Sequence, residues 1–239
     1  GRAAIHAGGA DAEKELTVKV EKADTPRVLL TPKPDGKIID VTIDGKLLTA
    51  YYYGADWKKP FLWPVNSEGG VTLTRNYPMS NDDKPKDHPH HKSMWSAYGN
   101  VNDADCWMEE EGSGFQKAQD VTFGSGDAYG WILSKDVWTG KDGKTVIGEE
   151  REYRFYAVPE KGRFIDERIV FTATEGDVKF GDTKEGGIIA VRMRGDICGP
   201  DKAIITNALG DKGEKTLWGK PSPTRSTNWA VSCCSFIAR

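Results

Sequence analysis

The sequence predicts an all-β protein, a large antiparallel β-sandwich of twelve or more strands with very little helix. Short runs alternate apolar and polar residues, whereas apolar residues never keep a helical i, i+3, i+4, i+7 spacing beyond a turn or two. Asp-Gly pairs stand between apolar runs at two places, which is the strongest short signal for a hairpin. The 239 residues include 27 glycines and eight each of Trp, Tyr and Phe. Such a composition is typical of many tight turns around an aromatic core.

The predicted strands follow one another at short intervals, separated by Pro, Gly and Asp. The Asp-Gly turns fall at Asp44-Gly45 and Asp142-Gly143. In the segment of residues 150–160 one face reads Tyr153, Phe155 and Ala157. The strand-like segments are LTVKVEK (16–22), RVLLTP (27–32), KIIDVTIDG (37–45), KLLTAYYYG (46–54), SMWSAYGNV (93–101), KAQDVTFG (117–124), YGWILSKDVWTG (129–140), EREYRFYAVPE (150–160) and RFIDERIVFTATE (163–175).

The chain divides into three parts in this interpretation. Residues 1–15 form a flexible N-terminal segment, residues 16–220 a single sandwich domain, and residues 221–239 an atypical C-terminal tail. The opening GRAAIHAGGADA is small and flexible, as expected either for the remnant of an exported precursor or for a disordered terminus. The first alternative predicts a periplasmic or extracellular protein.

Charge and cysteine content exclude several classes. The net charge is −3, and no run of Lys and Arg suits a phosphate backbone, so we expect no nucleic-acid partner. No stretch reaches the 18 apolar residues of a membrane span. Cys106, Cys198, Cys233 and Cys234 form no CxxC motif, which leaves a Cys106–Cys198 disulfide as one option that spacing alone does not settle. No GxSxG, P-loop or Rossmann fingerprint is present.

Three of the four histidines lie in DHPHHKSMW, as His88, His90 and His91. Imidazole beside a carboxylate can bind a divalent metal, and it can also transfer protons near neutral pH. Pro89 favours an extended chain, which would place His88 and His90 on one side and His91 on the other. We therefore expect His88 and His90 to be the better pair, with a metal as the minority alternative and no other cofactor.

Catalysis by these histidines requires a carboxylate from elsewhere in the chain. The candidates are Asp103 and Asp105 in NVNDADCW, and Asp182 and Glu185 in FGDTKEGG. The second segment has flanking glycines that allow close backbone approach, although an ordinary charged turn would look the same.

A binding surface for a hydroxyl-rich or anionic ligand is predicted around the same region. Tryptophan stacks on the apolar face of a pyranose, although a role in core packing explains any one of them equally well. Lys92 is expected to be a surface charge. The predicted ligand-binding residues are Arg75, Asn100, Asp103, Trp95 and Trp107, with Trp63 nearby.

Three segments, KKPFLWPVNSEGGVTLTRNYPM, DHPHHKSMWSAYGNVNDADCW and DVKFGDTKEGGIIAVRM, resemble in that order the hallmarks of the PmoA-like family. The likeness runs from about Leu16 to Lys220, and the residues after TLWGK depart from the family pattern. Some collections label this family "methane oxygenase PmoA", but genuine particulate methane monooxygenase subunits are integral membrane proteins. The resemblance instead implies an exported sandwich similar to the galactose-mutarotase-like supersandwich enzymes. By that analogy His88, His90 or His91 would pair with Glu185 or Asp182.

These observations favour a carbohydrate-active enzyme, hydrolytic, lytic or epimerising, that uses histidine and carboxylate as acid and base on a glycoside or sugar derivative. A non-catalytic carbohydrate-binding protein is the second hypothesis. A metal-dependent oxidoreductase, as the family label suggests, is the third.

Overall fold

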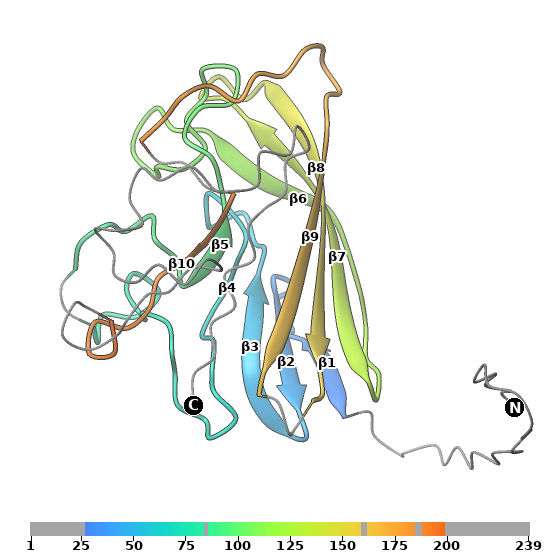
Figure 1. Cartoon of the computed structure of the whole chain (residues 1–239). Helices are drawn as coiled ribbons and strands as arrows, with labels where there is room; N and C mark the ends of the chain where they lie inside the picture. The colour runs from blue at the N-terminus through green and yellow to red at the C-terminus, as the bar shows by residue number, and fades with distance from the viewer. Residues whose placement is uncertain (1–26, 84–85, 159–161, 185–187, 199–239) are drawn as a thin grey trace, which may run out of the picture.

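The computed structural model describes residues 27–83, 86–158, 162–184 and 188–198, and within them every regular element is a β-strand. The predicted all-β class is therefore confirmed. Ten strands form two antiparallel sheets, consistent with a β-sandwich (Figure 1). The expected strand at 16–22, the N-terminal segment and the C-terminal tail lie outside the described residues.

The larger sheet has six strands in the order β1-β2-β3-β4-β5-β10. Its first three strands follow one another in sequence, while the last pair joins segments almost a hundred residues apart. The strands are β1 (Val28–Pro32), β2 (Ile38–Ile43), β3 (Lys46–Tyr52), β4 (Phe61–Leu62), β5 (Met94–Ser96) and β10 (Ile189–Val191).

The smaller sheet has four long strands in sequence order, β6-β7-β8-β9. It is a meander in which each strand pairs with the next through nearly its whole length. The strands are β6 (Phe115–Gly124), β7 (Tyr129–Thr139), β8 (Thr145–Tyr156) and β9 (Phe164–Thr172).

Both predicted Asp-Gly turns are confirmed, with different loop lengths. Between β2 and β3 the loop is Asp44-Gly45 alone, and both residues have positive φ, 50° and 77°. That conformation is the one a two-residue hairpin needs for its twist to match the strands. Between β7 and β8 the loop is longer, and Gly143 takes the positive φ, 79°.

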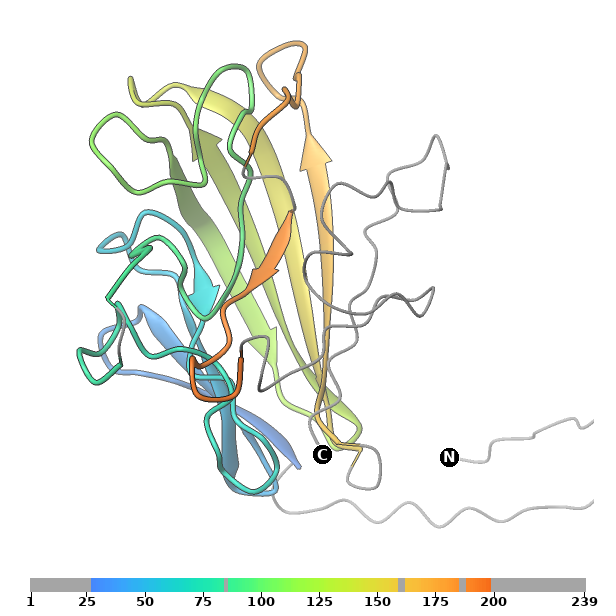
Figure 2. The ribbon, with the colours of Figure 1, turned by 60° about the vertical axis from the view of Figure 1, so that its left-hand side comes forward.

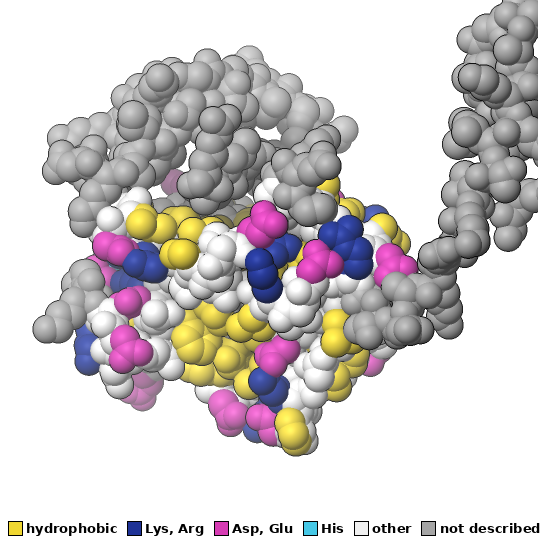
Figure 3. Space-filling view, turned by 90° about the horizontal axis from the view of Figure 1, so that it is seen from below, with side chains coloured by type: hydrophobic (Ala, Val, Ile, Leu, Met, Phe, Trp, Pro, Cys, Tyr) yellow, Lys and Arg dark blue, Asp and Glu magenta, His cyan; other side chains and the backbone are white. Residues whose placement is uncertain are grey.

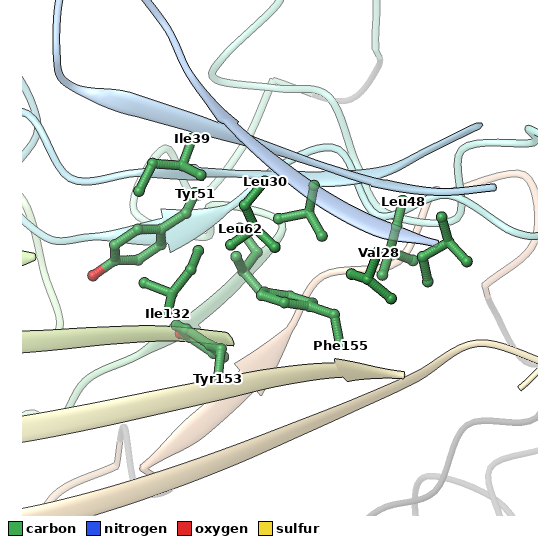
Figure 4. Packing of buried hydrophobic residues seen from close by; sticks show 11 residues of the cluster. Val28, Leu30, Ile39, Leu48, Tyr51, Leu62, Ile132, Tyr153 and Phe155 are labelled. Carbon is green, nitrogen blue, oxygen red and sulfur yellow. The ribbon is translucent and has the colours of Figure 1, made fainter. Parts of the chain in front are cut away.

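The main hydrophobic core lies between the sheets (Figure 4). Period-2 alternation decides which side chains enter it. On β8 the residues Tyr153 and Phe155 are fully buried, and both face the other sheet, where Tyr51 of β3 is fully buried as well. The remaining buried members of this cluster are Val28, Leu30, Ile39, Val41, Ile43, Leu48, Leu62 and Ile132.

Figure 3 shows the end of the sandwich that lies lowest in Figure 1. On this surface hydrophobic side chains lie among charged ones of both signs. Large exposed hydrophobic residues of the described chain include Leu47, Val71, Tyr129 and Phe164. No helix among the described residues is long and apolar enough to cross a membrane.

Gly130 sets how closely β1 approaches β7. A Cβ at this position would lie 2.4 Å from Leu30 Cδ1 and 2.8 Å from Val28 Cγ1. We expect Gly130→Ala to lower the free energy of unfolding by about 1–3 kcal/mol, because the added methyl group overpacks the interface between the sheets. Urea denaturation measures this loss. Gly69→Ala is the control, since the nearest atom to its Cβ is 3.9 Å away; equal losses in both variants would contradict the packing argument.

Candidate functional site

The histidine segment is held between two other segments that are distant in sequence. β5 pairs with β10 from Met94↔Val191 to Ser96↔Ile189. Just beyond this pairing, the Arg192 N–H donates to the carbonyl of Ser93 at 2.7 Å, and the Arg75 N–H donates to the carbonyl of Arg192 at 2.8 Å. The backbone therefore brings the neighbourhoods of residues 75, 92 and 192 together (Figure 2).

The three histidines of this segment form one cluster of rings. The ring centroids of His88 and His91 are 4.9 Å apart and stacked, and those of His90 and His91 are 4.5 Å apart and edge-to-face. The expected extended geometry, with His91 on the opposite side, is wrong. His88 has φ of 47°, and the His91 N–H donates to the carbonyl of His88 at 3.0 Å. The chain thus turns at Pro89 instead of continuing straight.

His91 is an aromatic packing residue. Its ring stacks on Trp95 at 5.1 Å and meets Trp107 edge-on at 5.9 Å. Neither ring nitrogen has a hydrogen-bond partner among the described residues. Burial, with the charges of neighbouring histidines and arginines, lowers the pKa of His91 to about 3. His91 is consequently a neutral imidazole near neutral pH, and its ring stacks against that of His88.

Asp87 and His88 form a carboxylate–imidazole pair at the exposed side of the cluster. His88 Nδ1 lies 3.1 Å from Asp87 Oδ2, and the side chain of His88 is 52% exposed. Arg75 donates to Asp87 Oδ1 at 2.5 Å and to the His88 carbonyl at 2.9 Å. Although partial burial opposes ionisation, the hydrogen bonds from Arg75 and His88 hold the pKa of Asp87 below its usual value. This carboxylate is therefore ionised and fixed beside the imidazole.

Arg75 is positioned as a scaffold for this pair. Its residue is 2% exposed, and its third acceptor is the carbonyl of Tyr77 at 3.2 Å. A buried guanidinium that bridges a side chain and two carbonyls holds the backbone of the turn. The ligand-binding role predicted for Arg75 remains a prediction that these contacts do not require.

Lys92 is buried, so the expected surface charge at this position is wrong. Its ammonium group forms an ion pair with Glu109 and donates to the Pro89 carbonyl at 3.2 Å. It also lies 5.2 Å from the ring centroid of Trp57. Burial lowers the pKa of Lys92, and Glu109 opposes that effect. The ion pair and the tryptophan face compensate the lost hydration and fasten the histidine turn to the loop after β5.

Lys59 contributes a second buried ammonium to the same carboxylate. Its Nζ lies 3.3 Å from Glu109 Oε1 and donates to the carbonyl of Trp107. Burial lowers the pKa of Lys59 to about 8. Two cations consequently share one carboxylate beneath the histidine cluster.

No group of three or more His, Cys, Asp and Glu side chains in the described part of the chain has the arrangement of a metal site. The stacked rings of His88 and His91 give a physical reason within the cluster. Face-to-face imidazoles direct their nitrogens in parallel planes, whereas a shared ion needs them to converge.

Other predicted residues lie in a neighbouring loop region. The Asp103 N–H donates to Asn100 Oδ1 at 3.1 Å, and both residues belong to the turn after β5. Asp182 is exposed and follows Gly181, whose N–H donates to the Asn100 carbonyl at 2.9 Å. Asp105 accepts hydrogen bonds from the backbone N–H groups of Trp107 and Met108. Asp87, which was not among the predicted carboxylates, contacts His88, and Glu185 lies outside the described residues.

Both cysteines in the described part of the chain are free. Cys106 is buried and Cys198 is exposed. The Cys106–Cys198 disulfide, one option at the level of sequence, is therefore not formed.

A second polar cluster, which the sequence did not predict as a unit, lies inside the sandwich. Arg151 of β8 is fully buried, and its Nε donates to Glu149 Oε1 at 2.5 Å and lies 3.7 Å from Glu167 Oε1. Asp136 Oδ2 is 4.0 Å from Arg151 Nη2. The available signal was the alternation itself, because it turned Glu167 inward together with Ile165.

This interior cluster contains more acids than bases. Burial raises the pKa of Asp136 to about 6, against the attraction of Arg151. Burial also raises the pKa of Glu167. Asp136 and Glu167 therefore hold their protons more tightly than they would in water.

The fold and the two clusters define a β-sandwich protein. Its histidine cluster packs against two tryptophans beside strands β5 and β10 of the larger sheet. The chain belongs to a family whose model, described as a family of unknown function (DUF6807), matches residues 38–231. Neither the curated proteins nor the solved structures contain a significant match to the chain.

We expect the interior acids to make the fold less stable as pH rises. The native pKa of Asp136, about 6, exceeds its ordinary 3.8. The associated stabilisation is therefore complete below the ordinary value and is lost as pH rises through the native value. Between about pH 4 and about pH 8 the wild type should lose about 1–3 kcal/mol more unfolding free energy than Asp136→Asn, measured by urea denaturation.

The control for this comparison is Asp56→Asn, because the Asp56 side chain is 74% exposed. It should retain the pH dependence of the wild type. A wild-type profile parallel to that of Asp136→Asn would contradict the prediction.

Proposed function

We propose that the protein is a carbohydrate-active enzyme in which His88 acts as the general acid and base. The observation that carries this proposal is the Asp87–His88 pair. Arg75 holds its carboxylate, and the ring of His91 stacks against its imidazole. A carboxylate on Nδ1 favours the imidazole tautomer with its proton on that nitrogen. The other nitrogen, Nε2, is then free to accept or return a proton.

The environment of His88 supports this role. Half of its side chain is exposed, so a substrate can reach it, while Asp87 and the stacked His91 restrict its motion. The indoles of Trp95 and Trp107 are buried and pack against His91, so they hold the histidine rings in place and offer no stacking face to a sugar. The ionised Asp87 would stabilise the imidazolium that forms after proton transfer.

The finer family assignment and the location belong to the same proposal. The sequence likeness to the PmoA-like family and the sandwich of two antiparallel sheets support an analogy with sugar-active supersandwich enzymes. The same resemblance supports export to the periplasm or the cell exterior.

His88→Asn should reduce kcat on an accepted glycoside by about 100-fold or more, because the acid–base group is lost. Asp87→Asn should reduce kcat less and shift the pH–rate profile, since the tautomer and the imidazolium lose their support. A panel of glycosides, followed by chromatography of products, provides the assay. Asp56→Asn is the matched control for the carboxylate change.

Full activity in His88→Asn would refute the assignment of His88. Absence of turnover across neutral, acidic and oxidised glycosides by the wild-type protein would refute the enzyme.

The second candidate is carbohydrate binding without catalysis, and a different surface favours it. An open depression of about 350 Å³ on the outer side of the smaller sheet is lined by Tyr129, Trp131, Leu133, Glu150 and Glu152. The indole of Trp131 occupies the space where a side chain at Gly124 would lie, with Nε1 only 2.5 Å from that Cβ position. A tryptophan seated over a glycine beside two carboxylates offers both a stacking face and hydroxyl acceptors.

Trp131→Ala should weaken binding of an oligosaccharide to this surface by about 10-fold or more, as expected when a stacking ring is removed. Gly124→Val should weaken it as well, because the added side chain displaces the indole. Isothermal titration calorimetry with the same glycans measures both effects. Val71→Ala, at another exposed hydrophobic position, is the control; equal affinity in all four proteins would exclude this surface.

A further inference from the structure

We propose that the His88 site takes a sugar carboxylate, a uronic acid residue, whose carboxylate binds the guanidinium of Arg192. This inference rests on the proposed function, because it names the substrate class of the same site. Four features of Arg192 support the proposal. They are the position of its backbone, the N–H groups of its guanidinium, the charges around the cluster, and the distance between Arg192 and His88.

Arg192 is fixed by its backbone and open at its side chain. Its N–H donates to the carbonyl of Ser93, and its carbonyl accepts from the Arg75 N–H, so the Cα cannot drift from the histidine segment. The side chain is 36% exposed. A guanidinium that reaches solvent from an anchored backbone is suited to bind an incoming anion.

Most N–H groups of the Arg192 guanidinium have no hydrogen-bond partner among the described residues. Its contact among the described residues is one long ion pair, Nη2 to Asp87 Oδ1 at 3.5 Å. Arg75 already donates to that same oxygen at 2.5 Å. Arginine has five N–H groups and binds carboxylates through two parallel hydrogen bonds, so a substrate carboxylate would be a better partner than the shared Asp87 oxygen.

The ion pairs around the cluster leave Arg192 as the cation that an anion can reach. Arg75 pairs with Asp87, and Lys92 and Lys59 share Glu109. Asp83 and Asp105 add weaker attractions to Arg75 and Lys59. Arg192 has one ion pair among the described residues, at 3.5 Å, so its charge is incompletely neutralised and attracts an anionic ligand.

The spacing fits one sugar unit. Arg192 contacts Oδ1 of Asp87 and His88 contacts Oδ2 of the same carboxylate. The guanidinium and imidazole nitrogens that contact this carboxyl group are consequently no more than about 9 Å apart, a span that one pyranose unit can bridge. A uronate whose carboxylate lies on Arg192 would therefore present its ring carbons and glycosidic oxygen to His88.

Binding of uronate oligosaccharides and of their methyl esters tests the proposal, because esterification removes the negative charge and leaves the sugar ring unchanged. Isothermal titration calorimetry with glucuronate, galacturonate, mannuronate and guluronate oligomers should find at least one acid that binds about 10-fold or more tightly than its ester. Arg192→Gln should abolish that preference. Arg168→Gln, at an arginine on the smaller sheet whose side chain is 64% exposed, should retain it.

Equal affinity for every acid and its ester, no binding of any acid, or an unchanged preference in Arg192→Gln would each overturn the uronate assignment. The proposed function fails separately. Turnover of neutral glycosides that depends on His88, without any preference for acids, would remove the uronate and keep the enzyme.

Discussion

The packing of two antiparallel sheets against each other is the constraint from which the rest of the structure follows. Alternation along most of β7, β8 and β9 sends every second side chain into the space between the sheets. Most of these are apolar, as Ile132 and Phe155 are, but the same rule also carries Arg151 and Glu167 inward. Since a buried charge without a partner is costly, these groups had to meet one another.

The histidine site depends on a different kind of interaction, a buried guanidinium that fixes a turn. Pro89 and the positive φ of His88 bend the chain, and Arg75 bonds to both Asp87 and the His88 carbonyl across that bend. Lys92 fastens the turn from the other side by donating to the Pro89 carbonyl. The imidazole at the surface is therefore supported by charges that are themselves buried and paired.

The fold was largely predictable because its signals are local. Alternation and the Asp44-Gly45 pair depend only on neighbouring residues, and both appear in the structure as expected. The arrangement of the site was less predictable, since it depends on contacts across about a hundred residues. Nothing near His88 in sequence reveals that the backbone of Arg192 lies beside Ser93. The turn at Pro89 was missed for a related reason, because proline favours an extended predecessor and tertiary bonds to Arg75 overrode that preference.

The sandwich holds two clusters of titratable side chains, the histidine cluster and the interior acids, and their surroundings indicate which one could do chemistry. The interior cluster holds unusual pKa values, which often mark functional sites, but structural ion-pair networks produce the same shifts. Arg151 and Asp136 are each 2% exposed or less, and the two sheets cover them from both sides. A substrate cannot reach these groups without separating the sheets. His88, by contrast, is oriented by a fixed carboxylate and is open to solvent. Access, more than the size of a pKa shift, therefore favours the histidine site as the place of the proposed reaction and leaves the interior acids as a determinant of stability.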